Sequence, residues 1–159
     1  MTTMTLKEIG TIMVTDDRMY LQIKAPYRKG LVALQEFSHL VLLYWADQAD
    51  EPDYRNFVFI DQQVYRHAPE QMGVFATRSA YRPNPILSST VKPLKIDCQQ
   101  GIIDLPYIDA FNGTPLLDIK PYTPSIDRVA TYQSPDWCSH WPQTIESSGD
   151  FPWEEEFLF

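Results

Sequence analysis

Residues 73–91 read Gly-Val-Phe-Ala-Thr-Arg-Ser-Ala-Tyr-Arg-Pro-Asn-Pro-Ile-Leu-Ser-Ser-Thr-Val and place a polar loop between two apolar segments. Arg82 and Asn84 each precede a proline, and steric crowding by the proline ring favours extended backbone at both positions. The prolines themselves fix φ and donate no N–H. We therefore expect a stiff polar loop, which is the best place in this chain to look for a site.

The side chains of this loop could bind a carboxylate, a phosphate or a ribose. Arg78 and Arg82 carry planar guanidinium groups that match the geometry of carboxylates and phosphates. Short hydrogen-bonding groups accompany them at Thr77, Ser79, Asn84, Ser88 and Ser89. A rigid surface turn with solvated arginines is the alternative, and composition alone does not separate the two.

Outward from this loop the sequence predicts many short strands and few helices. Residues 8–14 and 19–24 are expected to pair as a hairpin across a polar turn. Residues 91–98 and 102–108 form a second such pair, because apolar and polar side chains alternate there. The apolar run 40–45 is typical of a central strand. The predicted fold class is mainly β: a small closed antiparallel β-barrel with few short helices.

Two other segments complete this prediction. Residues 30–37 carry apolar side chains at positions 31, 34 and 37, a spacing compatible with two helical turns. Residues 47–56 are rich in acidic and amide side chains, so we expect an exposed loop before a strand at residues 57–60.

Length and composition limit the class of protein. With 159 residues and 44% hydrophobic content, the chain is long enough for one domain with a core and short for two. The N-terminus lacks an apolar signal segment, and the densest apolar run, residues 40–46, is too short to span a bilayer. We expect a soluble, cytoplasmic protein without a membrane partner.

The cysteines and histidines predict no metal site. Cys98 and Cys138 stand far apart in the sequence without ligand spacing, so free thiols are expected. His39, His67 and His140 are scattered singly, which favours structural roles. Glycine-rich nucleotide-binding motifs and a nucleophile elbow are absent from the sequence, which argues against a Rossmann-type fold and against a hydrolase.

Three blocks of the sequence resemble the tRNA methyltransferase O family, also called the TsaA-like or YaeB-like family. The blocks are Phe-Ser-His-Leu at 37–40, Gly-Val-Phe-Ala-Thr-Arg-Ser at 73–79 with Arg-Pro-Asn-Pro at 82–85, and Gly-Thr-Pro-Leu-Leu-Asp-Ile-Lys-Pro-Tyr at 113–122. They stand in the family's order, and the resemblance covers roughly residues 8–126.

The resemblance implies a small β-barrel that binds S-adenosylmethionine, acts as a homodimer, and methylates N6 of threonylcarbamoyl-modified adenosine beside a tRNA anticodon. Residues 1–134 would form the barrel domain, and the aromatic, acidic tail 135–159 would pack on that domain or on a partner subunit. The sequence lacks the family's Pro-Arg-Gln segment near the N-terminus. It also reads Asp47-Gln48 where the family often has His-Gln, so an altered cofactor site is expected.

Carried over by motif, the resemblance implies cofactor-binding residues in three segments. They are Asp47 and Gln48; Arg78, Ser79, Arg82 and Thr90; and Ile108, Asp109, Ala110 and Phe111. Arg78 or Arg82 would bind the methionine carboxylate, and backbone groups of residues 108–111 would bind the adenine edge.

Asp118 and Lys120 are the predicted catalytic residues. They alternate with Ile119 in an extended segment, so they would share one face with Tyr122. The methylated nitrogen of the family's substrate is conjugated to a carbonyl, so a base or a strong electrostatic partner would help. The alternative is a solvated polar face, and Pro121 indicates that the strand ends there or lies at an edge.

Net charge argues against an RNA acceptor. The formal charge of -8 and the pI near 4.7 repel a polyanion unless the basic residues gather on one face, so tRNA is a disfavoured partner. Three hypotheses remain, in this order: a tRNA adenosine methyltransferase, a methyltransferase of the same scaffold that acts on a small molecule or protein, and a non-catalytic cofactor-binding module.

Overall fold

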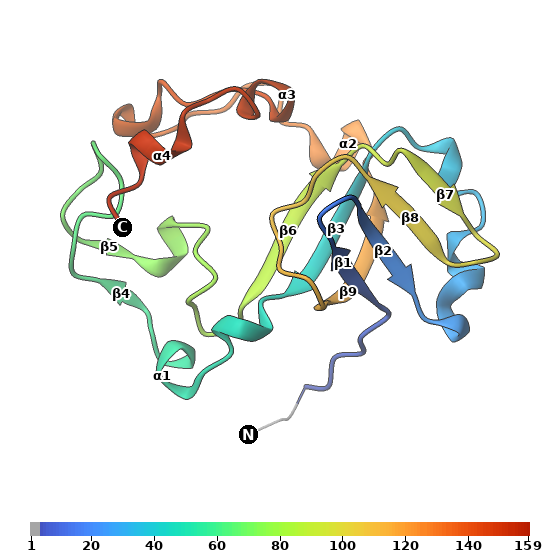
Figure 1. Ribbon diagram of the computed structural model, residues 1–159. Helices are drawn as coiled ribbons and strands as arrows, with labels where there is room; N and C mark the ends of the chain where they lie inside the picture. The colour runs from blue at the N-terminus through green and yellow to red at the C-terminus, as the bar shows by residue number, and fades with distance from the viewer. Residues whose placement is uncertain (1–3) are drawn as a thin grey trace.

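One antiparallel sheet of seven strands organises the chain in the computed structural model, which describes residues 4–159 (Figure 1). Across the sheet the order is β6 (Ile86–Val91), β3 (Leu40–Trp45), β9 (Thr114–Pro121), β1 (Gly10–Val14), β2 (Met19–Ile23), β8 (Ile102–Leu105) and β7 (Lys95–Asp97). A separate two-stranded sheet pairs β4 (Phe59–Ile60) with β5 (Met72–Gly73). The predicted mainly antiparallel β fold is confirmed.

The strands form where apolar and polar residues alternate in the sequence. β1 pairs with β2 from Gly10↔Ile23 to Val14↔Met19, and β7 pairs with β8, so both predicted hairpins are confirmed. β3 lies between β6 and β9, as expected for an apolar strand that is covered on both edges. The β7–β8 turn contains Gly101 at φ 70°, where an added Cβ would lie 2.8 Å from the Ile23 carbonyl oxygen. Glycine is therefore required in this turn.

The predicted closure of the barrel is not confirmed. β6 and β7 are the two ends of the strand order, and in the part of the chain that the structure describes they are not paired with each other. Only residues 92–94 connect these two strands, so the sheet must curl until its edges approach at this corner. Pro93 lacks an N–H and cannot extend a ladder there, which favours a curled but open sheet.

The core lies inside the curl. Along β3 the inward residues Leu40, Leu42 and Tyr44 are buried, while their neighbours on the outer face keep partial exposure. Ile12, Leu21, Leu42, Ile103 and Leu116 have no exposed surface. Each of these aliphatic side chains contributes about 1.5–3 kcal/mol through burial, so the inner face supplies most of the folding energy.

The helices are short. They are η1 (Ala25–Leu31), η2 (Leu34–Glu36), η3 (Asp47–Ala49), α1 (Pro52–Arg55), η4 (Val74–Ala76), α2 (Pro124–Asp127), η5 (Asp136–Cys138), α3 (Ile145–Ser148) and α4 (Trp153–Glu156). The two helical turns expected at residues 30–37 are instead parts of two 3-10 helices, because Ala33 adopts a left-handed φ of 68° between them. Within residues 4–159, no helix combines the length and the apolar character needed to cross a membrane.

The tail after residue 134 contacts residues 64–66 of the same chain. Trp137 stacks on Tyr65 with ring centroids 5.5 Å apart, Trp141 meets the same ring edge-on at 5.3 Å, and Phe157 forms an isolated β-bridge with it. Figure 1 shows this tail, in red, beside the segment that carries β4 and β5. The aromatic tail therefore packs on the chain itself, and the division of domains at residue 134 stays a prediction.

Glu156 stabilises the packing of the tail, and acidic pH is expected to weaken this packing. Its carboxylate is buried and accepts hydrogen bonds from His140 Nε2 at 2.9 Å and Trp141 Nε1 at 3.0 Å. These bonds, that of His140 foremost, lower the pKa of Glu156 below its ordinary value of 4.5. The stabilisation is therefore complete above pH 4.5 and is lost as the pH falls through the lower folded pKa.

Tryptophan fluorescence followed from neutral to acidic pH measures this effect. Glu156→Gln is expected to shift the acid transition, whereas Glu154→Gln, an exposed neighbour, should leave it in place. Identical acid transitions in the wild type and Glu156→Gln would contradict this role of the carboxylate.

Candidate functional site

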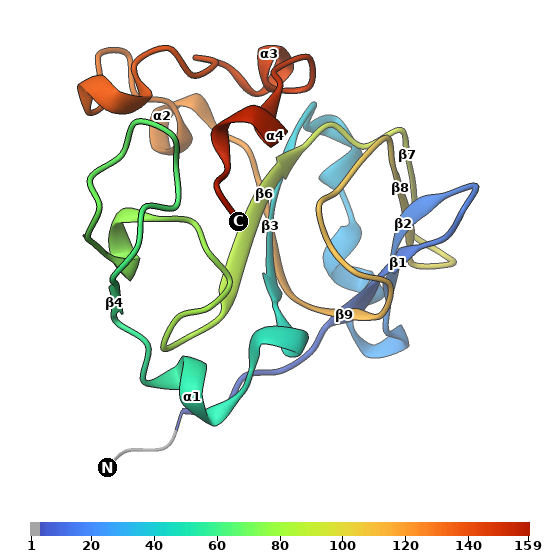
Figure 2. The same cartoon turned by 60° about the vertical axis from the view of Figure 1, so that its left-hand side comes forward.

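A hollow of about 550 Å³ lies at the β6 edge of the sheet, and we call it the β6 hollow. Its lining residues are Tyr44, Phe75, Ala76, Thr77, Arg78, Arg82, Ile86, Leu87, Ser88, Ser89 and Asp109. Figure 2 shows the loop that precedes β6 running beside that strand. The volume falls in the range of small-molecule sites, so the edge strand and its loop could together hold a ligand.

The β6 hollow reaches both faces of its edge strand. In the pairing with β3, Leu87 lies opposite Tyr44 and Ser89 opposite Leu42, so both point towards the core side. Ser88 lies opposite Leu43 and therefore points to the outer face. A ligand in this hollow would contact inner and outer side chains of the same strand.

Tyr44 forms the inner wall of the hollow. Its hydroxyl donates to the Asp109 carbonyl oxygen at 3.1 Å and lies 2.9 Å from Ser89 Oγ. Burial raises the pKa of Tyr44 above 10.0, and the hydrogen bond with Ser89 opposes part of this rise. The side chain is therefore a neutral phenol near pH 7 that holds the Asp109 segment against β6.

The two arginines line the hollow and have no carboxylate partner within residues 4–159. Arg78 Nη2 donates to Ser88 Oγ at 2.9 Å and to the Ser88 carbonyl oxygen at 3.3 Å. Arg82 Nη2 donates to the carbonyl oxygens of Val74 and Thr77, both at 3.2 Å. Neither guanidinium belongs to any ion pair formed within residues 4–159. Since a guanidinium has five N–H donors, both can still bind an anion.

Local hydrogen bonds fix the loop that carries these arginines. Thr77 is buried; its hydroxyl donates to the Val74 carbonyl oxygen at 2.8 Å and accepts from the Ser79 N–H at 3.3 Å. At the other end Pro85 is buried, and its carbonyl oxygen accepts from the Ala46 N–H at 2.8 Å. The loop is thus anchored at both ends, in agreement with the stiffness expected from its prolines.

Of the predicted cofactor residues, the structure places Arg78, Arg82 and Asp109 in the lining of the β6 hollow. The others lie outside that lining: Asp47, Gln48, Ser79, Thr90, Ile108, Ala110 and Phe111. Asp47 and Gln48 are exposed on η3, just beyond β3, while Ile108 is buried in the core. Their binding roles stay predictions.

The predicted catalytic pair lies on the outer face of β9. Lys120 Nζ is 2.7 Å from Asp118 Oδ2, and this hydrogen bond together with the opposite charge raises the pKa of Lys120. Leu43 pairs with Ser88 on one side and Asp118 on the other, so all three face outwards in one row. The shared face predicted for Asp118 and Lys120 agrees with this register, but one strand separates the pair from β6.

β9 ends at Pro121, as expected from the sequence. Within residues 4–159, β9 pairs with β1 only over residues 114–116, whereas residues 118–121 pair only with β3. The acidic and basic side chains therefore stand on a stretch of strand with one free edge, although the strand as a whole is internal. Both alternatives from the sequence, a site and a solvated polar face, fit this position.

Sequence reasoning missed Tyr44 and Phe75. Tyr44 stands within the apolar run 40–45 and is indistinguishable there from a core aromatic. Phe75 lies in the signature loop, and its 76% exposure at the rim of the hollow is visible only in the structure. Within residues 4–159, no group of three or more His, Cys, Asp or Glu side chains could hold a metal ion.

Known proteins are similar in sequence to most of this chain. The family model of the tRNA-methyltransferase O N-terminal domain matches residues 9–128. A probable S-adenosyl-L-methionine-binding protein of Methanocaldococcus jannaschii is 37% identical over 122 residues, which cover 77% of this chain and 94% of that protein. A tRNA (adenine(37)-N6)-methyltransferase of Escherichia coli is 39% identical over 108 residues, which cover 65% of this chain and 45% of that enzyme.

The fold agrees with the sequence relationship. A crystal structure of TrmO from Pseudomonas aeruginosa matches with a TM-score of 0.62 and 30% identity, covering 83% of this chain and 62% of that one. The chain spans 27% of a probable S-adenosyl-L-methionine-binding protein of Archaeoglobus fulgidus, with which it is 38% identical over 109 residues. Because the family model covers residues 9–128 and the fold is shared, this chain belongs to the tRNA methyltransferase O family.

Proposed function

We propose that the protein is an S-adenosylmethionine-dependent methyltransferase that methylates N6 of an adenosine in tRNA. One observation carries the proposal: Arg78 and Arg82, both without a carboxylate partner in the described part of the chain, line a hollow that also contains Tyr44 and Asp109. The names of two relatives support it, since one is a probable S-adenosyl-L-methionine-binding protein and the other a tRNA (adenine(37)-N6)-methyltransferase.

The residues of the β6 hollow fit this cofactor. S-adenosylmethionine carries a carboxylate, an ammonium group, a sulfonium and an adenosine, and it would supply an electrophilic methyl group. Two guanidinium groups match the carboxylate, and the Asp109 carboxylate matches the positive groups. The exposed ring of Phe75 offers an aromatic face to a cation.

The protein's own task would be to bind and align. Arg78 would fix the methionine end of the cofactor while Ser88 holds its guanidinium in place. Ile86, Leu87 and Phe75 would exclude water from the apolar part of the hollow. Holding donor and acceptor in line lowers the barrier without a covalent intermediate, so positioning is the main contribution expected.

Asp118 and Lys120 are proposed to act on the acceptor. N6 of adenine must lose a proton as it gains a methyl group, and Asp118 would accept that proton. The row Ser88, Leu43 and Asp118 on the outer face supports this role, because an acceptor whose N6 lies over Leu43 would have the hollow on one side of that nitrogen and the carboxylate on the other. The ion pair with Lys120 would orient Asp118.

We also propose that the protein works in the cytoplasm as a homodimer. The β6 hollow is open at a sheet edge, and the exposed Phe75 and Ile86 at its rim would be covered by a second subunit. A methyltransferase that acts on a small molecule or a protein is the second candidate. The net charge of -8 favours it, because a polyanionic acceptor is repelled.

Transfer of labelled methyl groups separates these candidates. Purified protein with methyl-labelled S-adenosylmethionine is incubated with total tRNA and, in parallel, with an RNA-free extract of small molecules and proteins. The proposal predicts label in tRNA, recovered as an N6-methylated adenosine derivative after digestion to nucleosides. Label only in the RNA-free fraction would replace the tRNA proposal by the second candidate, and label in neither would leave a binding module.

A further inference from the structure

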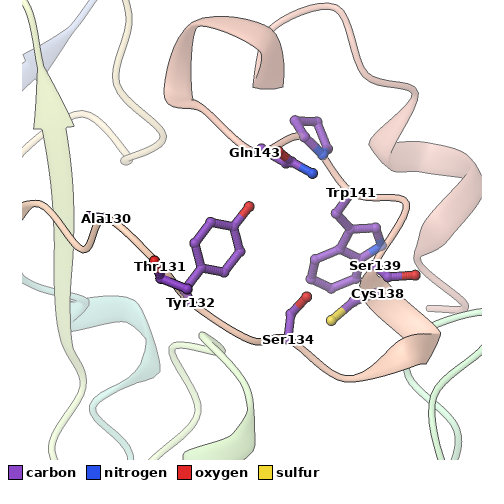
Figure 3. A pocket seen from close by; sticks show the side chains of 9 residues that line it. Ala130, Thr131, Tyr132, Ser134, Cys138, Ser139, Trp141 and Gln143 are labelled. Atoms are coloured by element: carbon purple, nitrogen blue, oxygen red, sulfur yellow. The ribbon is translucent and has the colours of Figure 1, made fainter.

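A second hollow of about 510 Å³ lies in the segment after the family domain, and we call it the tail hollow. Its lining residues are Ala130, Thr131, Tyr132, Ser134, Cys138, Ser139, Trp141, Pro142 and Gln143 (Figure 3). The family model ends at residue 128, so this hollow lies outside the part of the chain that the model matches. A ligand-binding site here would act in addition to the β6 hollow.

Two aromatic side chains dominate the tail hollow. Figure 3 shows the Tyr132 ring and the Trp141 indole on two sides of it, with Gln143 at one end and Ser134 at the other. Tyr132 is 53% exposed, so its ring is accessible to a ligand. The indole N–H of Trp141 donates to Glu156 Oε2 at 3.0 Å, which fixes the orientation of that wall.

The lining selects a planar, neutral ligand with a hydrogen-bonding edge. None of its nine residues is charged, so a phosphate or carboxylate would find no cation there. The hydroxyls of Thr131 and Ser134 and the amide of Gln143 would remain unpaired against an aliphatic ligand. A nucleobase satisfies both requirements, since its faces stack on aromatic rings and its edge carries donors and acceptors.

The side chain of Tyr65 connects the tail hollow to the β6 hollow. Trp141 meets Tyr65 edge-to-face with ring centroids 5.3 Å apart. Burial raises the pKa of Tyr65, and the nearby Arg78 backbone opposes part of that rise. Arg78 itself lines the β6 hollow. A base held against Trp141 would therefore lie near the proposed cofactor.

We propose that Tyr132 and Trp141 form a stacking slot for an unpaired nucleobase of the RNA acceptor, next to the adenosine that is methylated. The inference rests on the proposed tRNA methyltransferase function and deepens it. It also bears on the acidic charge of the chain, because stacking supplies affinity that does not depend on phosphate neutralisation.

Tyr132→Ala is the variant that tests the slot. The side chain is exposed and takes part in none of the hydrogen bonds described, so its loss should not disturb the fold. The KM for a short RNA hairpin whose loop contains the acceptor adenosine is expected to rise about tenfold, as for the loss of one stacked base. The Kd for S-adenosylmethionine should stay unchanged, Tyr132→Phe should retain the wild-type KM, and Phe159→Ala, an exposed aromatic of the same tail, should have no effect.

An unchanged KM in Tyr132→Ala, with an active wild type, would overturn the inference. A second readout covers the case in which no RNA is methylated: the tryptophan fluorescence of the full chain is titrated with the same hairpin, with its fully paired duplex and with free adenosine. Saturable quenching by the hairpin alone that is lost in Tyr132→Ala supports a slot for an unpaired base in RNA even if the proposed activity fails. Quenching only by free adenosine, or none, would reject it.

Discussion

Arg78→Ala is expected to raise the Kd for S-adenosylmethionine by about 10- to 150-fold, equivalent to about 1.5–3 kcal/mol for a lost charge-assisted hydrogen bond. The guanidinium lies in the β6 hollow, is held by Ser88 Oγ at 2.9 Å, and belongs to no ion pair within the described residues. Its charge is therefore free to bind the methionine carboxylate. Calorimetric titration of the variant and the wild type measures the change.

Two further variants give this prediction its controls. Arg128→Ala removes an arginine of the same charge at the end of α2, outside the β6 hollow, and should leave the Kd unchanged. Arg78→Lys keeps the charge but loses the planar fork, so an intermediate Kd is expected. If Arg78→Ala binds as tightly as the wild type, Arg78 has no role in holding the cofactor.

Leu42→Ala is expected to lower the free energy of unfolding by about 2–5 kcal/mol, the usual cost of the cavity left by a fully buried leucine. Leu42 has no exposed surface and lies in β3 between Ser89 of β6 and Ile119 of β9. The cavity would open in β3, the strand that joins β6 of the candidate site to the rest of the core. Urea denaturation measures the loss as a lower transition midpoint.

The matched control is Leu94→Ala. Leu94 is 68% exposed at the corner between β6 and β7, so its truncation should change the free energy of unfolding by no more than about 0.5 kcal/mol. Equal midpoints for Leu42→Ala and the wild type would mean that β3 is not the centre of the core.

The strands were predictable because their signals are local. Alternation along residues 91–98 and 102–108 and the polar turn between residues 14 and 19 are enough to define both hairpins. Closure of the sheet is not local, since it depends on whether the distant edges β6 and β7 pair. The left-handed Ala33, which interrupts the helix expected at residues 30–37, has no sequence signal, because alanine normally favours a helix.

Part of the candidate site was also predictable, because its sequence signal is local to one loop. Arg78 and Arg82 stand in a loop whose prolines and hydroxyls make it conspicuous, and both line the hollow. Tyr44 was not predictable as a wall, because only the pairing of β3 with β6 brings its hydroxyl to Ser89. Asp47 and Gln48 were placed by motif alone, and the turn of η3 leaves them exposed beyond the end of β3.

A crystal structure of the protein grown with S-adenosylmethionine tests the central claim most directly. The account predicts ligand density in the β6 hollow, with the methionine carboxylate hydrogen-bonded to Arg78 or Arg82 and the Tyr44–Ser89 contact beside it. Cofactor bound at another place on the chain, with the β6 hollow holding only solvent, would contradict it.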